Sequence, residues 1–186
     1  MATNKRDLLL ATAERLFYTE GYHATGIDRI LSESGVAKMT LYKHFKSKDA
    51  LILAVLEARQ LPMLERLREA RSALPPRKAL LSVFDGLNNM IHSPTAFCGC
   101  LFINAAAEYL DREHPIHQRA AGYKAQFQHH LRELLEALDA PQPQQLARQL
   151  QFLIEGALSM AHIEGPEDQA LLAKASAEQL LQAAGV

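Results

Sequence analysis

The residues with the clearest chemical pattern lie in one short stretch near the N-terminus. Hydrogen-bonding groups and positive charges recur there at close spacing, on Lys38, Thr40, Tyr42, Lys43, His44 and Lys48. Side chains of these types bind phosphate oxygens and form hydrogen bonds with the edges of base pairs, which points to a nucleic acid as partner. A generic pair of helices with a basic face has a similar composition, so spacing alone leaves both interpretations open.

Two cysteines form a second candidate site. Cys98 and Cys100 are the only cysteines, and their close spacing is poor geometry for a disulfide between them. A thiol beside Gly99 at a helix entrance can react with electrophiles or oxidants, because a helix N-terminus stabilises a thiolate. The alternative is a pair of buried, inert thiols. Together with His92 the set lacks a strong fourth zinc ligand, so we expect no metal site.

The chain contains no glycine-rich phosphate loop, nucleophile elbow or metalloprotease motif. We therefore expect no catalytic residues, no cofactor and no enzyme activity. A chain of 186 residues that is 48% hydrophobic and 22% charged is neither disordered nor fibrous. Its apolar runs are too short to span a membrane, and its N-terminus lacks the core of an export signal, so a cytoplasmic protein is expected.

Charge is distributed unevenly along the chain. Residues 1–48 carry eight basic against five acidic side chains, a net charge of +3, whereas the remainder carries twelve against sixteen, a net charge of −4. A basic module followed by an acidic one suggests that only the first meets a polyanion.

The spacing of apolar residues at i, i+3, i+4 and i+7 predicts an all-α protein. We expect about nine helices, near residues 5–18, 25–34, 38–45, 48–74 and 76–92, then one that follows Phe97-Cys-Gly-Cys and ends near residue 110, and three more near 115–138, 143–164 and 166–184. Thr25 is expected to cap the second helix, and Pro62 to kink or break the fourth. The second and third helices, joined by a tight turn at Gly35, have the spacing of a helix-turn-helix.

These two helices carry a distinctive motif. Thr25-Gly-Ile-Asp-Arg-Ile and then Gly35-Val-Ala-Lys-Met-Thr-Leu-Tyr-Lys-His-Phe-Lys-Ser-Lys-Asp-Ala-Leu51 resemble the signature of the tetracycline-repressor (TetR) family of bacterial regulators. The resemblance covers about the first 50 residues. It implies a helix-turn-helix DNA-binding domain at residues 1–48, with three N-terminal helices, and a variable helical domain for effector binding and dimerisation at 49–186.

The resemblance also implies residue roles. Bases or nearby phosphates would be faced by Lys38, Met39, Thr40 and Lys43, and backbone phosphates would be gripped by Thr25, Tyr42, His44 and Lys48. Leu41 and Phe45 would belong to the core. Met39 replaces the small residue often found there. Its apolar side chain can meet a thymine methyl group in the major groove, or it can pack sideways, and the sequence leaves both open.

The helix predicted at 143–164 has two apolar stripes, and the helix after it has more apolar surface than one partner covers. Two such helices predict a symmetric four-helix interface between two copies of the chain. The predicted interface residues are Phe152, Gly156, Ser159, Ile163, Leu172 and Leu180. A single leucine-rich core is the alternative. A homodimer also suits the two-fold symmetry of helix-turn-helix operators.

A mixture of aromatic and polar residues on the fifth to eighth helices is the candidate lining of an effector pocket. Its members are Phe84, Leu87, Asn88, Phe102, Tyr109, Tyr123, Phe127 and Met160, each of which can equally be ordinary core. The function predicted is a ligand-responsive regulator, favoured as a repressor that a small molecule releases from a palindromic operator. The alternatives are a thiol-based sensor using Cys98 and Cys100, and a small helical carrier or enzyme using Cys98, Cys100, Glu108 or the histidines.

Overall fold

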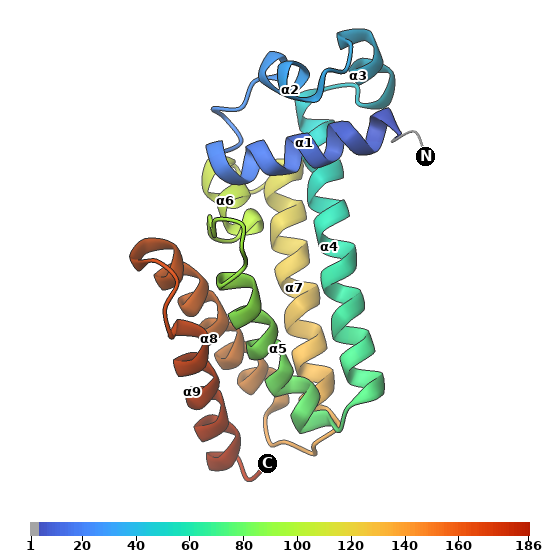
Figure 1. The fold of residues 1–186 in the computed structure, drawn as a ribbon. Coiled ribbons are helices and arrows are strands. Elements are labelled where there is room, and N and C mark those ends of the chain that lie inside the picture. The colour runs from blue at the N-terminus through green and yellow to red at the C-terminus, as the bar shows by residue number, and fades with distance from the viewer. Residues whose placement is uncertain (1–3) are drawn as a thin grey trace. The chain divides into compact units, whose positions relative to one another are not determined.

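The computed structural model describes residues 4–186, and every regular element in that range is an α-helix (Figure 1). The helices are α1 (Lys5–Glu20), α2 (Ile27–Ser34), α3 (Lys38–His44), α4 (Lys48–Ala73), α5 (Pro76–Ile91), α6 (Leu101–Glu108), α7 (Pro115–Glu136), α8 (Pro143–Glu164) and α9 (Gln169–Ala183). The all-α prediction is confirmed. No helix in the described part of the chain is long and apolar enough to cross a membrane.

The chain divides into two compact units. The first unit contains the residues up to Leu61 together with Leu101–Tyr123, and the second contains Pro62–Cys100 and Lys124–Val186. Helices α4 and α7 each contribute to both units. Because the N-terminal helices share a unit with α6, compactness does not divide the chain at residue 48. The functional boundary between 1–48 and 49–186 stays a prediction.

The first unit is built around one face of α1. Leu9, Ala13, Leu16 and Phe17 recur at helical spacing and are fully buried. Further apolar side chains of this unit are also buried, namely Ile30, Leu41, Phe45, Leu51, Ile52 and Phe102. The side chain of Asn4 caps α1 by accepting a hydrogen bond from the N–H of Arg6 at 3.1 Å.

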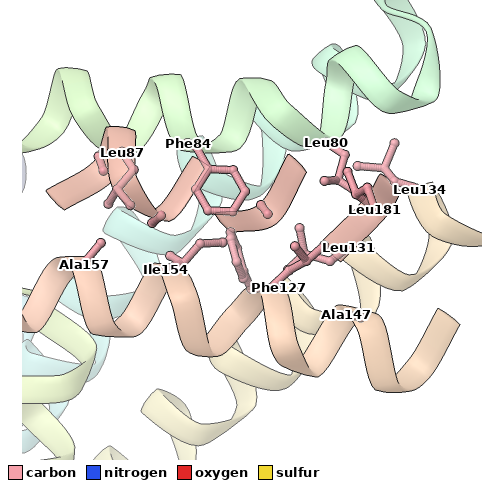
Figure 2. Packing of buried hydrophobic residues seen from close by; sticks show 14 of the residues in the cluster. Leu80, Phe84, Leu87, Phe127, Leu131, Leu134, Ala147, Ile154, Ala157 and Leu181 are labelled. Atoms are coloured by element: carbon pink, nitrogen blue, oxygen red, sulfur yellow. The ribbon is translucent and has the colours of Figure 1, made fainter. Parts of the chain in front are cut away.

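The core of the second unit lies among α5, α7, α8 and α9. Figure 2 shows Phe84 from α5 and Phe127 from α7 beside Ile154 of α8, with leucines from α5, α7 and α9 farther along. These are the large residues whose removal from water drives helix association.

Two expectations about the helix limits are wrong. Helix α4 runs through Pro62, so the expected break is absent, since one missing N–H costs less than the rest of a 26-residue helix contributes, while the expected kink stays a prediction. Helix α6 begins at Leu101, directly after the Cys-Gly-Cys segment, because Gly99 takes a φ of +82° that is incompatible with a helix. Helix α9 begins at Gln169, so Pro166 lies in the preceding loop.

Candidate nucleic-acid interface

A glycine makes the turn between α2 and α3. Gly35 has φ +65° and ψ 13°, in the left-handed region, and its N–H closes α2 by donating to the Leu31 carbonyl at 3.0 Å. Val36 follows and is buried, with its N–H donating to the Ser34 hydroxyl at 3.3 Å. The turn can therefore redirect the chain within three residues, and α3 begins at Lys38.

The core determines which side of α3 faces outward. Leu41 is fully buried and Phe45, at the C-cap, is 4% exposed. A helix turns by about 100° per residue, so Met39 and Lys43, each two residues from Leu41, lie on the opposite side. Met39 is 87% exposed, and Lys43 is exposed as well. These two side chains form the outermost ridge of α3.

The remaining polar residues of α3 flank this ridge. Lys38 is exposed and forms an ion pair with Asp28 of α2 at 3.3 Å, Thr40 is half-buried, and His44 is exposed. Tyr42 is 44% exposed, so its hydroxyphenyl group is available to a partner. Lys38, Met39, Thr40, Tyr42, Lys43 and His44 thus all lie on α3, and their contact with DNA stays a prediction.

Lys48 begins α4 and is half-buried. Its Nζ donates a hydrogen bond to the carbonyl oxygen of His23 at 3.4 Å. Burial lowers the pKa of the Lys48 ammonium, although the carboxylates of Glu108 and Asp49 act to raise it. At its own N-terminus α4 is capped by Ser47, whose hydroxyl accepts from the N–H of Ala50 at 3.0 Å.

Thr25 does not lie where the sequence places it. Its side chain is fully buried, and its Oγ1 lies 2.7 Å from the Gly21 carbonyl oxygen and 3.3 Å from that of Leu16. It is also not the cap of α2, a position that Gly26 occupies. The expected phosphate contact is therefore corrected to a structural role, in which the hydroxyl closes the turn after α1.

A carboxylate distant in sequence holds the turn that precedes α2. Glu108, the last residue of α6, accepts hydrogen bonds from the N–H groups of Tyr22 at 2.8 Å and His23 at 2.6 Å. The ring Nδ1 of His23 lies 3.0 Å from the same carboxylate. At the other end of α6, the Tyr22 hydroxyl donates to the Leu101 carbonyl at 2.9 Å. Both ends of α6 are thus tied to the turn between α1 and α2.

Electrostatics favour the ionised form of this carboxyl. Partial burial raises the pKa of Glu108, but the N–H donors of His23 and Tyr22 and the His23 ring outweigh burial, so the pKa lies below its ordinary value. Next to it, burial and the charges of Asp49 and Glu108 raise the pKa of Tyr109 to about 12. The Tyr109 ring lies between those of His23 and His114, with centroid distances of 4.8 and 4.7 Å.

The sequence analysis named Glu108 and the histidines only for the carrier or enzyme alternative, and it gave neither Glu108 nor His23 a part in the helix-turn-helix. The hydrogen bonds between them join positions 85 residues apart, and neither residue belongs to a motif with a known spacing. A lone glutamate at the end of a short helix gives no signal of its own.

The candidate thiols lie in the second unit. The Nζ of Lys124 approaches the Cys100 sulfur at 3.5 Å and also donates to both carboxylate oxygens of Glu155, at 2.6 and 2.8 Å. Cys98, by contrast, approaches a backbone carbonyl, that of Ala96, at 3.7 Å. Both thiols are half-buried.

Helices α8 and α9 expose an apolar face. The second predicted stripe of α8, formed by Phe152, Gly156, Ser159 and Ile163, is exposed along its whole length. Phe152 is 62% and Ile163 75% exposed, and Leu172 of α9 is 60% exposed. Leu180, the last predicted interface residue, is instead partly buried against the core of the second unit. We name the exposed set Phe152, Ile163, Leu171 and Leu172 the α8–α9 face.

The predicted effector lining is divided between the units. Phe102 and Tyr123 stack at 3.9 Å in the first unit, which also contains Tyr109. Phe84, Leu87 and Phe127 lie in the core of the second unit, whereas Met160 is 42% exposed. Asn88 has a buried Oδ1 that accepts no hydrogen bond from the described residues. The lining as a whole stays a prediction.

Known families match both parts of the chain. The family model described as "Bacterial regulatory proteins, tetR family" matches residues 9–55. The model described as "Tetracyclin repressor-like, C-terminal domain" matches residues 76–177, more than half of the chain. The first match includes α2, α3 and the turn between them.

Individual relatives agree with this result. A TetR-family transcriptional regulator from Streptomyces coelicolor has a similar structure, with 35% identity, a TM-score of 0.92 and coverage of 98% of this chain and 96% of that one. Reduced Escherichia coli NemR is 25% identical, with a TM-score of 0.86 and coverage of 94% and 95%. The HTH-type transcriptional regulator YjdC of E. coli K12 is 25% identical over 180 residues, 96% of this chain and 94% of YjdC.

The hydrogen bonds of Glu108 predict a pH-dependent stability difference. We expect Glu108→Gln to lower the free energy of unfolding by about 2 kcal/mol at pH 7, because an amide replaces a carboxylate that accepts charge-assisted hydrogen bonds. Since the pKa of Glu108 is lowered by folding, the difference is complete above the ordinary value of 4.5 and disappears as the pH falls through the lowered pKa. Urea unfolding measured from neutral pH down to well below the ordinary pKa of a glutamate follows it. The exposed Glu57→Gln is the control, and an equal, pH-independent effect of both substitutions would contradict the prediction.

Proposed function

The chain belongs to the tetR family of bacterial regulatory proteins, and from that premise we propose that it is a repressor that binds a palindromic operator as a homodimer and is released by a small molecule. The observation that carries the proposal is the outward ridge of α3, with Met39 and Lys43 opposite the buried Leu41. In a helix-turn-helix, the second helix enters the major groove and presents such side chains to base edges.

Phosphate contacts would position this helix. Tyr42 and His44 lie on the flank of α3, and Lys48 lies at the positive end of the α4 dipole, where an anion is favoured. A phosphate beside Lys48 would also stabilise its charged form, which burial disfavours in the free protein. Lys38 and Thr40, in the first turn of α3, would reach bases or adjacent phosphates. We retain these residues, without Thr25, as the DNA-binding set.

The α8–α9 face supports the homodimer. Large apolar side chains that stay exposed on two helices packed against each other are typical of an interaction site. Helices α8 and α9 both contribute, and the association of two copies would form a four-helix interface of the kind that closes a two-fold dimer. Gly156, between Phe152 and Ile163 in the stripe, would allow the backbones of the two α8 helices to approach closely.

The second unit is the proposed effector domain. The buried Oδ1 of Asn88, on the same helix as Phe84 and Leu87, supports an effector that brings an N–H or O–H donor to an otherwise apolar environment. Binding releases the operator only if the effector prefers the conformation that does not fit DNA, and a typical coupling of this kind is about 1–3 kcal/mol.

A thiol-based trigger is the second candidate. The specific observation is the approach of Lys124 Nζ to Cys100 Sγ, because an ammonium group stabilises a thiolate and so increases its reactivity. An adduct on Cys100 would also disturb the pair of Lys124 with Glu155, which joins α7 to α8. In this version the effector is an electrophile that forms a covalent bond.

Selection of random duplex DNA by the purified protein tests the proposed function. We expect a palindromic motif whose binding weakens as salt increases, because Lys side chains displace counterions from phosphates. In the dimer, Lys48→Ala should reduce the slope of log affinity against log salt by about two, one for each copy. Tyr42→Ala is the matched control, which lowers affinity and leaves the slope unchanged because tyrosine is neutral. A folded dimer that enriches no sequence would overturn the proposal.

The α8–α9 face predicts the effect of a charge on assembly. We expect the double substitution of Phe152→Glu and Ile163→Glu to give a monomer in sedimentation equilibrium, because four like charges would meet at a two-fold interface. Helix content should be unchanged, since both side chains are exposed in one chain. Leu110→Glu, at a residue that is 79% exposed in the first unit, should leave the dimer intact. A dimer that survives the double substitution would place the interface elsewhere.

Alkylation distinguishes the thiol-based trigger from reversible effector binding. If Cys100 is the trigger, iodoacetamide should release the wild-type protein and the Cys98→Ser variant from the operator, as measured by fluorescence anisotropy. Cys100→Ser should remain bound, because it lacks the sulfur beside Lys124. Release of Cys100→Ser by the reagent, or retention of the wild-type protein, would eliminate this candidate and leave the repressor proposal intact.

A further inference from the structure

Met39 is the most exposed large apolar side chain in the described part of the chain, at 87%. It lies on α3 about 200° around the helix from Leu41, whose burial keeps it turned away from the core. The sideways packing that the sequence left open does not occur. Packing within the chain does not bury this side chain, so a partner that covers the ridge of α3 would bury it.

The chemistry of the major groove restricts what Met39 can contact there. The polar edges of the base pairs offer hydrogen-bond donors and acceptors, which a thioether matches poorly. The one apolar group that a base pair presents in this groove is the 5-methyl group of a pyrimidine. It belongs to thymine, or to cytosine that has been methylated at the same carbon.

We propose that Met39 contacts the 5-methyl group of a thymine at one fixed position in each half of the operator. This inference rests on the proposed function and names the base that the ridge selects. Met39 discriminates through apolar contact alone, and its unbranched side chain can adjust to the methyl group. Lys43, one helical turn further along, contributes donors and charge that do not depend on a methyl group.

The first test removes only the methyl group. In the operator recovered by selection, each thymine is replaced in turn by deoxyuridine, which keeps every hydrogen-bonding group of the base pair. At one position in each half-site we expect the affinity to fall about fourfold, the equivalent of one buried methyl group, and the two changes together to lower it about 16-fold. Fluorescence anisotropy at constant salt measures these changes.

Variants at position 39 assign the methyl contact. Because Met39 is exposed, Met39→Ala should fold normally, bind the thymine operator as weakly as the wild-type protein binds the deoxyuridine operator, and no longer distinguish the two. Met39→Leu should keep most of the distinction. Lys43→Ala is the control on the same ridge, and it should weaken binding to both operators by the same factor.

Selection from two random pools, with cytosine either unmodified or 5-methylated, identifies the source of the methyl group. Thymine at the sensitive position in both pools supports the proposal. A motif that appears only with methylated cytosine would overturn the assignment to thymine. The proposal is also overturned if no thymine is sensitive, or if the sensitivity persists in Met39→Ala, while the operator still binds. Failure to enrich any operator would overturn the proposed function itself.

Discussion

Burial of Leu41 and Phe45 is the constraint on which the candidate interface depends. An isolated helix of seven residues is unstable in water, so α3 owes both its helical form and its rotation about its axis to these contacts. Rotation by one residue, about 100°, would turn Met39 and Lys43 away from the ridge and bring other side chains in their place. The buried residues of α3 therefore determine which side chains it exposes to a partner, and Gly35 permits the turn that brings Leu41 to the core.

The second constraint ties α6 to the beginning of the helix-turn-helix. The chain passes from the second unit into the first at Cys100 and Leu101, where α6 starts, and Glu108 at the end of α6 holds the backbone of Tyr22 and His23. Charge-assisted hydrogen bonds are worth about 1.5–3 kcal/mol each, so breaking the set would cost more than a typical allosteric coupling of about 1–3 kcal/mol. It follows that a displacement of α6 would move the turn at Tyr22 and His23 with it and would leave these hydrogen bonds intact.

The sequence predicts the parts of this structure that depend on local pattern. The apolar positions of α3, the turn at Gly35 and the exposed stripe of α8 all follow from helical periodicity and glycine chemistry. The burial of Thr25 could not be foreseen, because a threonine at that spacing fits both a capping role and a closing bond to Gly21. The contacts of Glu108 and Lys124 escaped prediction for a different reason: they join residues 85 and 31 positions away, and periodicity contains no information on such pairs. Pro62 shows the opposite error, since its local preference is overridden by the helix around it.

In the proposed dimer, dimerisation and base contact would reinforce each other. A methyl contact contributes little in a single half-site. A two-fold dimer makes every contact twice, once in each half-site, so the factor by which it discriminates between operators is squared. The distribution of net charge along the chain also favours binding of DNA by its N-terminal part. Residues 1–48 have a net charge of +3 and the rest of the chain −4, so phosphates attract the helix-turn-helix and repel the remainder. Attraction of this kind is independent of sequence and supplies affinity for any duplex. The proposed apolar contact of Met39 would add no affinity for a site without the methyl group. It would therefore allow the protein to distinguish the operator from the surrounding DNA.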